Sequence, residues 1–257
     1  MSKHLIILPC HSIWTPGATL GELRDEWSLV SFQIEGYDHL CFKDHILKSL
    51  NILEQDKDAT LIISGGQTKQ ESGPISEALS YYQLATKLTN DIELVRRINT
   101  EEFARDSFEN VIFLLCRYFE LHKTYPEKIT IVGFEFKRQR FLENHLKQAL
   151  SFSRDVNYVG NAPTPKDLDE EGQINYFQDL EQQEYKHAVL HFEKDWYGIR
   201  SPLLDKKMKR DPFSRYHGYC QSNPKLAKFL VAISDQENQE ENLRSNESIQ
   251  SLLNDFT

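Results

Sequence analysis

The 257-residue sequence lacks the features that mark membrane and exported proteins. No apolar run approaches the roughly 20 residues that a helix needs to cross a bilayer, so we expect no membrane span. The first residues show neither an Arg-rich amphipathic stretch nor a signal-peptide cleavage pattern. These absences predict a cytoplasmic protein.

Cysteine and positive charge are also scarce. The four cysteines stand at positions 10, 41, 116 and 220 and form no Cys-x-x-Cys pair. This spacing argues against a zinc site or a disulfide framework and fits reduced thiols in the cytosol. The net charge of -9 at pH 7 argues against broad nucleic-acid binding, because such binding needs a basic surface.

The most informative stretch is an apolar run that ends in two glycines. Leu61-Ile62-Ile63-Ser64-Gly65-Gly66 is typical of a buried strand whose carboxyl end enters a tight loop, and a helix is expected over residues 74–88. Backbone N–H groups of Ser64, Gly65 and Gly66, beside the N-terminus of that helix, would suit an anion. The alternative is an ordinary strand-to-helix turn that uses glycine for its conformational freedom.

Strand-like and helix-like segments alternate between residues 5 and 159, which predicts a Rossmann-like α/β fold: a doubly wound, mostly parallel sheet with helices on both faces. The strands are expected at 5–8, 61–63, 92–98, 128–133 and 155–159, and the helices at 37–54, 74–88, 107–121 and 136–150. We divide the chain into a core domain at 1–159, a C-terminal extension packed on the core at 160–233, and a flexible acidic tail at 234–257.

Within the extension, residues 195–219 collect cationic and aromatic side chains in an otherwise acidic chain. A solvated, charged loop is one interpretation. The other is a lid over an anionic ligand, in which Arg210, Arg215 and His217 reach inward toward the strand ends.

Polar side chains follow the ends of the predicted strands, which is where open α/β sheets bind ligands. His11 follows the first strand, and we expect it to line the ligand site or to be a satisfied loop histidine. Pairing of Cys10 with His11 as nucleophile and base is disfavoured, because neighbouring residues of an extended chain point in opposite directions.

Glu77, Glu101 and Lys137 follow the second, third and fourth predicted strands. We expect all three to border one crevice, with Glu77 and Glu101 as an acid/base pair or, less favoured, as ligands for a hard cation. Lys137 and Arg140 would neutralise a bound anion, and the carboxylates would keep Lys137 charged. The residues assign no metal site and name no cofactor.

Four motifs resemble a known family in their order and spacing. They are the strand with Ser-Gly-Gly at 61–66, Ser-Glu-Ala at 76–78, Glu101 followed by Arg105-Asp106-Ser107-Phe108-Glu109-Asn110, and the segment 132–140 from Val132 to Arg140. Over residues 5–159 the chain resembles the SanA/ElyC/YdcF-like group, domain of unknown function 218. The resemblance implies a Rossmann-like fold with a polar cleft at the strand ends, with Asn110 among the ligand-binding residues. It implies no reaction, because the activity of that group is not established.

The sequence departs from that group at two motifs. The group's His stands here as Lys137, which would act as a fixed cation for phosphate or carboxylate, and its Ser-Arg-Asn-Thr stands as Ala104-Arg105-Asp106-Ser107. Bacterial envelope members carry a membrane anchor, which is not expected here. Residues 160–230 look like an elaboration found in cytosolic eukaryotic relatives.

Two functions fit these observations. We expect an enzyme that acts on a small anionic substrate, phosphorylated or nucleotide-like, at the carboxyl ends of the strands. The alternative is a binding module for a nucleotide-like ligand that uses the same pocket without turnover. A purely structural scaffold is disfavoured, because it does not need polar groups gathered at the strand ends.

Overall fold

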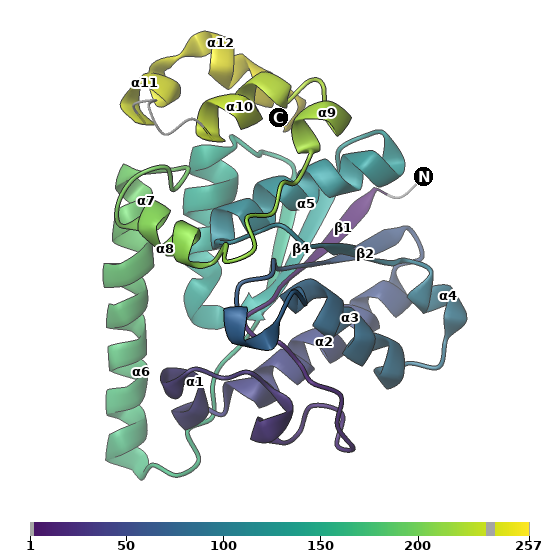
Figure 1. The fold of residues 1–257 in the computed structure, drawn as a ribbon, viewed down its shortest axis with the longest axis vertical. Coiled ribbons are helices and arrows are strands. Elements are labelled where there is room, and N and C mark those ends of the chain that lie inside the picture. Colours follow the sequence, from purple (N-terminus) through teal and green to yellow (C-terminus); the bar gives the residue numbers. More distant parts are fainter. Residues whose placement is uncertain (1–2, 235–239, 257) are drawn as a thin grey trace.

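A five-stranded sheet forms the centre of the computed structural model, which describes residues 3–234 and 240–256. Its strands are β1 (His4–Pro9), β2 (Ala59–Ser64), β3 (Ile98–Glu101), β4 (Lys128–Phe134) and β5 (Asp155–Asn161). All pair in parallel, in the order β3-β2-β1-β4-β5, and helices cover both faces (Figure 1). The predicted fold class is confirmed.

Strand β1 lies at the centre because its whole length is buried and both of its edges are paired. Its side chains alternate between the two layers of the molecule, as the two-residue period of a strand requires. Leu5 and Ile7 belong to one hydrophobic cluster, whereas Ile6 and Leu8 belong to the other. Continuous apolar runs are typical of parallel strands that are covered on both faces.

The main helices divide between these two layers. On the face of Ile6 and Leu8 lie α2 (Asp38–Gln55) and α3 (Glu77–Leu88); on the face of Leu5 and Ile7 lie α5 (Ser107–His122) and the π-helical segment η4 (Arg140–Ala149). Each agrees with a predicted helix to within a few residues. Helix α3 begins later than expected because the Ser76 hydroxyl accepts a hydrogen bond from Leu79 N, at 2.9 Å, and so caps it at Glu77.

One predicted strand is wrong. Residues 92–98 contain a short helix, α4 (Ile92–Val95), and only Ile98 begins β3. The Asp91 side chain accepts hydrogen bonds from the amides of Glu93 and Leu94, which fixes a helical turn at this point. The apolar residues of this segment fit both periods, so the cap decides the structure.

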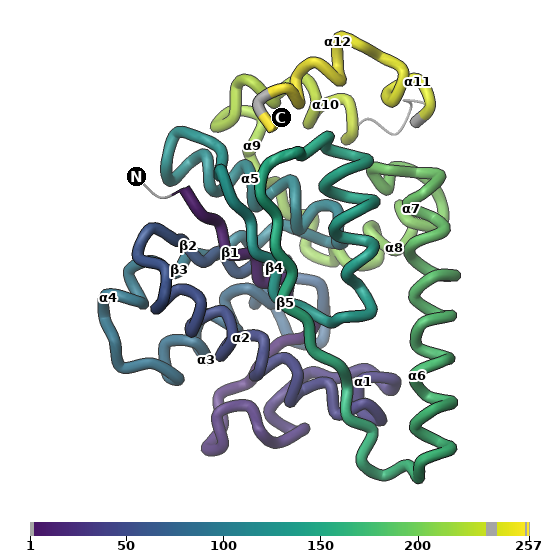
Figure 2. Tube along the Cα trace, turned by 180° about the vertical axis from the view of Figure 1, so that it is seen from behind, coloured from purple at the N-terminus to yellow at the C-terminus, as the bar shows by residue number. Residues whose placement is uncertain are grey.

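The connections and the extension add further short elements. Between β1 and α2 lie η1 (Arg24–Glu26) and α1 (Ser31–Glu35); between β2 and α3 lies η2 (Gln70–Ser72); η3 (Glu135–Lys137) follows β4; and the extension forms α6 (Glu170–Glu184), η5 (Tyr185–Val189), α7 (Leu190–Lys194), α8 (Leu203–Lys209), α9 (Tyr219–Ser222) and α10 (Ala227–Ser234). Figure 2 shows α6 standing beside the edge formed by β5. Within the described residues, none of these helices has both the length and the apolar character that crossing a membrane would require.

The last residues are not the flexible tail that their composition predicted. They form α11 (Glu240–Ser245), α12 (Glu247–Gln250) and η6 (Ser251–Phe256), while residues 235–239 and 257 lie outside the described part. Leu243, Leu253 and Phe256 are buried in the cluster that also holds α5. Phe256 packs edge-on against Tyr125, with ring centroids 4.9 Å apart. Three well-placed apolar side chains therefore anchor a segment that is polar on average.

A buried group of charges joins the extension to the core. The Lys207 ammonium of α8 lies 3.3 Å from Asp106 Oδ2 and 3.4 Å from Glu109 Oε1, at the start of α5. The Arg105 guanidinium binds Glu109 at 2.7 Å and reaches Asp211, after α8, at 3.1 Å. The two carboxylates outweigh burial and raise the pKa of Lys207, so the ammonium stays charged.

We expect Lys207→Met to lower the free energy of unfolding by about 3–5 kcal/mol, because it leaves the buried Asp106 carboxylate without its ion-pair partner and Glu109 with Arg105 alone. Lys209→Met, an exposed lysine on the same helix, should change it by about 0.5 kcal/mol or less. Urea unfolding of both variants at pH 7 measures this difference. Equal effects of the two substitutions would show that the buried charges do not hold the extension.

Candidate functional site

The direction of strand order reverses between β1 and β4, and open α/β sheets bind ligands at such a switch point. His11 follows β1 and Lys137 follows β4. The structure brings their side chains together, with Lys137 Nζ 3.3 Å from His11 Nδ1. The contact joins residues that are 126 positions apart in the sequence. The sequence grouped Lys137 with Glu77 and Glu101 and placed His11 only at the ligand site, so the contact between His11 and Lys137 is a finding of the structure.

His11 is held by rings from two layers of the fold. The centroids of Phe134 and Phe42 lie 5.2 and 5.7 Å from its imidazole, and Gln33 of α1 donates to its carbonyl at 3.0 Å. His11 Nε2 is buried and has no hydrogen-bond partner. Burial lowers the pKa of His11 well below its ordinary value, so the imidazole is neutral at pH 7.

The charges that act on His11 are those of other cations. After burial, its pKa is lowered further by Lys137, His45, Arg140 and Arg210. Lys137 and Arg140 follow β4 and Arg210 follows α8, whereas His45 has a pKa of about 4 and is neutral at pH 7. The chain as a whole carries a net charge of -9. The switch point is therefore a local region of positive potential in an acidic protein.

Lys137 is half-buried between the rings of Phe134 and Phe136, whose centroids lie 5.1 and 5.5 Å from Nζ. Burial lowers its pKa to about 7, and Arg140 acts in the same direction, against Glu184 and Asp38. The expectation that carboxylates would keep Lys137 charged is wrong. Across residues 3–234 and 240–256, no carboxylate lies within ion-pair distance of Nζ, so desolvation dominates.

Asp38 is a site residue that sequence reasoning missed. It opens α2, where an acidic side chain is usually explained by the helix dipole. Here it is buried, its Oδ1 has no hydrogen-bond partner, and burial raises its pKa to about 7 against the positive charge of Lys137. No sequence signal separates it from an ordinary helix-start aspartate.

Glu77 faces the same region from the first turn of α3. It is buried, and its carboxylate accepts a hydrogen bond from the Thr68 hydroxyl. Burial raises the pKa of Glu77. The hydrogen bond from Thr68 and the charges of Arg210, Lys69 and Lys137 lower it, but burial has the larger effect. Glu77 and Lys137 therefore share one neighbourhood, as predicted.

Glu101 does not join them. Its carboxylate is buried and accepts from Ser64 Oγ at 2.7 Å, from the Phe103 amide at 2.8 Å and from the Tyr219 hydroxyl at 3.2 Å. Ser64 Oγ also lies 2.8 Å from Asn110 Oδ1. Burial raises the pKa of Glu101 to about 7. Ser64, Glu101 and Asn110 form a closed internal group, so the expected pairing of Glu77 with Glu101 across one ligand does not fit this geometry.

The predicted anion cradle at the glycine loop is wrong. Gly65 N donates to Glu101 O at 3.1 Å and Gly66 N donates to Ala104 O at 2.8 Å, and neither glycine has a positive φ. Glycine is needed here for close approach. A Cβ on Gly65 would lie 2.9 Å from Glu77 Cβ, and one on Gly66 would lie 2.8 Å from Ala104 O. The loop brings Glu77 close to β1, and its amides serve the fold.

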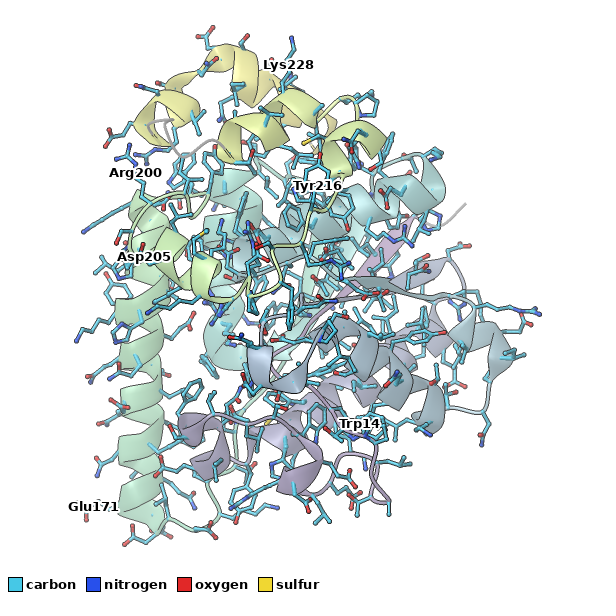
Figure 3. All side chains as sticks on the ribbon, in the orientation of Figure 1. Trp14, Glu171, Arg200, Asp205, Tyr216 and Lys228 are labelled. Atoms are coloured by element: carbon cyan, nitrogen blue, oxygen red, sulfur yellow. The ribbon has the colours of Figure 1, made fainter. Side chains whose placement is uncertain are left out.

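The cationic segment 195–219 lies along the strand carboxyl ends. Arg210 Nη1 donates to Arg105 O at 3.1 Å, and its charge acts on His11 and Glu77. Figure 3 shows Asp205 on α8 and Tyr216 on the next connection, both beside the α5 layer. Of the three residues predicted to reach inward, only Arg210 has a charge that lowers the pKa of His11 and Glu77.

The remaining predicted cations have other partners. Arg215 lies over the ring of Phe103 at 5.0 Å, and the ring of His217 packs at a tilt against Phe113 of α5, with centroids 4.5 Å apart. Arg140 forms an ion pair with Glu184 of α6, at 3.1 Å. Arg140 is therefore partly neutralised in this structure.

A surface hollow of about 440 Å³ lies at the opposite, amino ends of β1 and β4. Its central polar groups are satisfied, since His4 contacts Asp56 Oδ2 at 2.7 Å and Thr130 Oγ1 at 2.8 Å. The switch point, with its unpartnered His11 Nε2 and Asp38 Oδ1, is the better candidate site. In the part of the chain that the structure describes, no three His, Cys, Asp or Glu side chains are grouped to hold a metal ion.

Comparison with known proteins gives one close relative. The chain is 38% identical, over 262 aligned residues, to the uncharacterized protein YOR238W of Saccharomyces cerevisiae, and the alignment covers 85% of this chain and 86% of the yeast protein. The two proteins belong to one family. No family model matches the chain. No solved structure matches it either. The resemblance to the SanA/ElyC/YdcF-like group stays a prediction.

The pKa of Asp38 gives a test of the site's electrostatics. Because folding raises this pKa from 3.8 to about 7, the folded state binds more protons there than the unfolded state, and Asp38 makes stability fall as pH rises through that window. We expect Asp38→Asn to be more stable than wild type at pH 8, and this advantage to shrink by about 2–3 kcal/mol at pH 5 and to vanish only below the unfolded pKa.

Asp44, on the same helix, is the matched control. Burial alone would raise the pKa of Asp44, but hydrogen bonds from Lys48 and Asn161 hold it below the ordinary value. Its contribution to stability is present at neutral pH and is lost on acidification. Asp44→Asn should therefore be less stable than wild type at pH 8. Denaturant unfolding across pH 5 to 8 compares the two variants, and the same sign for both would contradict the assignment of Asp38.

Proposed function

We propose that the chain is an enzyme that acts on a small anionic substrate, phosphorylated or nucleotide-like, at the carboxyl ends of β1 and β4. The observation that carries this proposal is the positive potential at His11. Lys137, Arg140 and Arg210 lower its pKa, and its Nε2 atom is buried with no hydrogen-bond partner among the described residues. An anion placed at this point would supply the missing charge and would accept a hydrogen bond from any protonated nitrogen there.

Two carboxyl groups beside these cations are suited to proton transfer. Burial raises the pKa of Asp38 to about 7, and it also raises the pKa of Glu77. A general acid or base works best when its pKa lies near the working pH. Asp38 and Glu77 thus replace Glu77 and Glu101 as the proposed acid/base pair, with Glu101 left to the internal hydrogen bonds around Ser64.

The location of these residues agrees with the resemblance to the SanA/ElyC/YdcF-like group. Its Ser-Glu-Ala motif corresponds to Ser76-Glu77-Ala78, and the charges of Arg210 and Lys137 act on the pKa of Glu77. Membership of that group, as a cytosolic member with a C-terminal extension, is part of this proposal. A cytoplasmic location fits the four cysteines, which are all free.

The alternative function is a binding module with the same anion site and no turnover. One observation favours it. Arg140, which follows β4 and is the arginine expected to bind an anion, already forms an ion pair with Glu184. A binding protein can use the potential at His11 without a second free arginine, whereas an enzyme that stabilises developing charge benefits from one.

We expect Lys137→Met to abolish stabilisation by phosphate, pyrophosphate and nucleoside phosphates in a thermal-shift titration, because it removes the cation nearest to His11. Without ligand, its free energy of unfolding should change by about 1 kcal/mol or less, since Lys137 forms no ion pair. Lys147→Met, an exposed lysine on η4, should bind like wild type. Unchanged anion binding by Lys137→Met would contradict the proposed site.

Substitution of Glu77 separates the two functions. For an enzyme, Glu77→Gln should reduce turnover by about 100-fold or more while anion binding persists, because general acid–base catalysis is lost. Glu71→Gln, an exposed residue of η2, is the control. Phosphate release from a panel of phosphate esters measures turnover. Wild-type protein that binds these anions and turns over none of them would support the binding module.

A further inference from the structure

Two lysines of this chain, Lys207 and Lys137, are at least partly buried, and they differ in whether a carboxylate pairs with the ammonium. Lys207 is buried against Asp106 and Glu109, which satisfy its charge. Lys137 is half-buried, no carboxylate of the described residues lies in ion-pair range of it, and its Nζ contacts His11 Nδ1 at 3.3 Å. Lysine is rarely buried unless it is paired, so the isolation of Lys137 requires a reason other than stability.

The surroundings of Lys137 favour an uncharged amine. The rings of Phe134 and Phe136 flank Nζ, and the neighbouring cations are Arg140 of η4 and Arg210 after α8. Glu184 of α6 and Asp38 of α2 oppose them, and burial still lowers the pKa of Lys137 to about 7. His11, His45 and Glu77 are further titratable groups on this side; burial lowers the pKa of each histidine and raises that of Glu77. A desolvated lysine beside other cations is the arrangement that activates an amine as a nucleophile.

We propose that Lys137 is a covalent catalytic residue whose Nζ forms an imine with the carbonyl carbon of a small anionic aldehyde or keto acid. This inference rests on the proposed function and names its substrate class: an anionic group for the cations around His11, and a carbonyl for the amine. Lys137 is of intermediate exposure, so part of its side chain reaches the surface.

The step balances without a further reactant. The Nζ lone pair attacks the carbonyl carbon, and the carbonyl oxygen takes up a proton to give a carbinolamine. The C–O bond then breaks, the oxygen leaves as water with the protons of the amine, and a C=N bond remains. From a protonated amine, the products are one protonated imine and one water.

The neighbouring groups suit both halves of this step. Asp38, with its pKa near 7 and a free Oδ1, is the proposed donor to the departing oxygen. His11 Nδ1 lies beside Nζ and can take a proton from it. A protonated imine carries the same single positive charge as the ammonium, so the charge beside the anion is the same before the reaction and after it.

Reductive trapping tests the proposal directly. The intact protein is incubated with glyoxylate and cyanoborohydride at pH 7, digested, and analysed by peptide mass spectrometry. We expect Lys137 to be modified about tenfold or more faster than the exposed Lys147, because its amine is less often protonated. Inorganic phosphate should slow modification of Lys137 and leave that of Lys147 unchanged.

The variant Lys137→Arg keeps the cation and cannot form an imine. It should bind phosphate within about threefold of wild type and lose the fast modification. If phosphate stabilises wild type and Lys137→Arg but Lys137 is trapped no faster than Lys147, the imine is refuted and the anion site stands. If trapping at Lys137 is fast but indifferent to phosphate, the lysine is reactive and the anionic substrate class is refuted.

Discussion

The arrangement of the strand ends depends on the buried carboxyl group of Glu101. A buried carboxyl group is costly unless donors surround it, and this chain supplies donors from three places. They are Ser64 at the end of β2, the amides of the loop that follows β3, and the Tyr219 hydroxyl of the extension. This one group therefore fixes where β2 ends, how the chain enters α5, and where α9 lies on the core.

The same arrangement explains how the switch point is divided. The donors to the Glu101 carboxylate belong to the fold itself. The neighbouring amides of Gly65 and Gly66 donate hydrogen bonds to the carbonyls of Glu101 and Ala104. The groups left for chemistry are Lys137 and His11, which are in contact, and Glu77, on whose pKa the charge of Lys137 acts. The extension serves both sides, since Lys207 anchors it to α5 while the neighbouring Arg210 acts on the switch point.

Much of the fold could be predicted from the sequence because its strands are unbroken apolar runs and its helices have a clear apolar face. Prediction failed where a local polar contact or a few apolar residues decide the structure: the Asp91 cap turns 92–95 into a helix, and Phe256 helps to anchor a polar tail. In the site, the rule for strand ends placed His11 and Lys137 at the same edge of the sheet. It could not show that Asp38 is buried or that Glu101 is saturated with donors, because burial is a property of the assembled molecule.

The central position of β1 has a consequence for how the protein folds during synthesis. Once residues 3–101 have emerged, β1, β2 and β3 can pair, yet the second edge of β1 has no partner until residues 128–134 are made. An unpaired edge on a fully apolar strand is prone to wrong association. The nascent chain is therefore most in need of chaperone protection during the interval in which α5 is synthesised and β4 is still inside the ribosome.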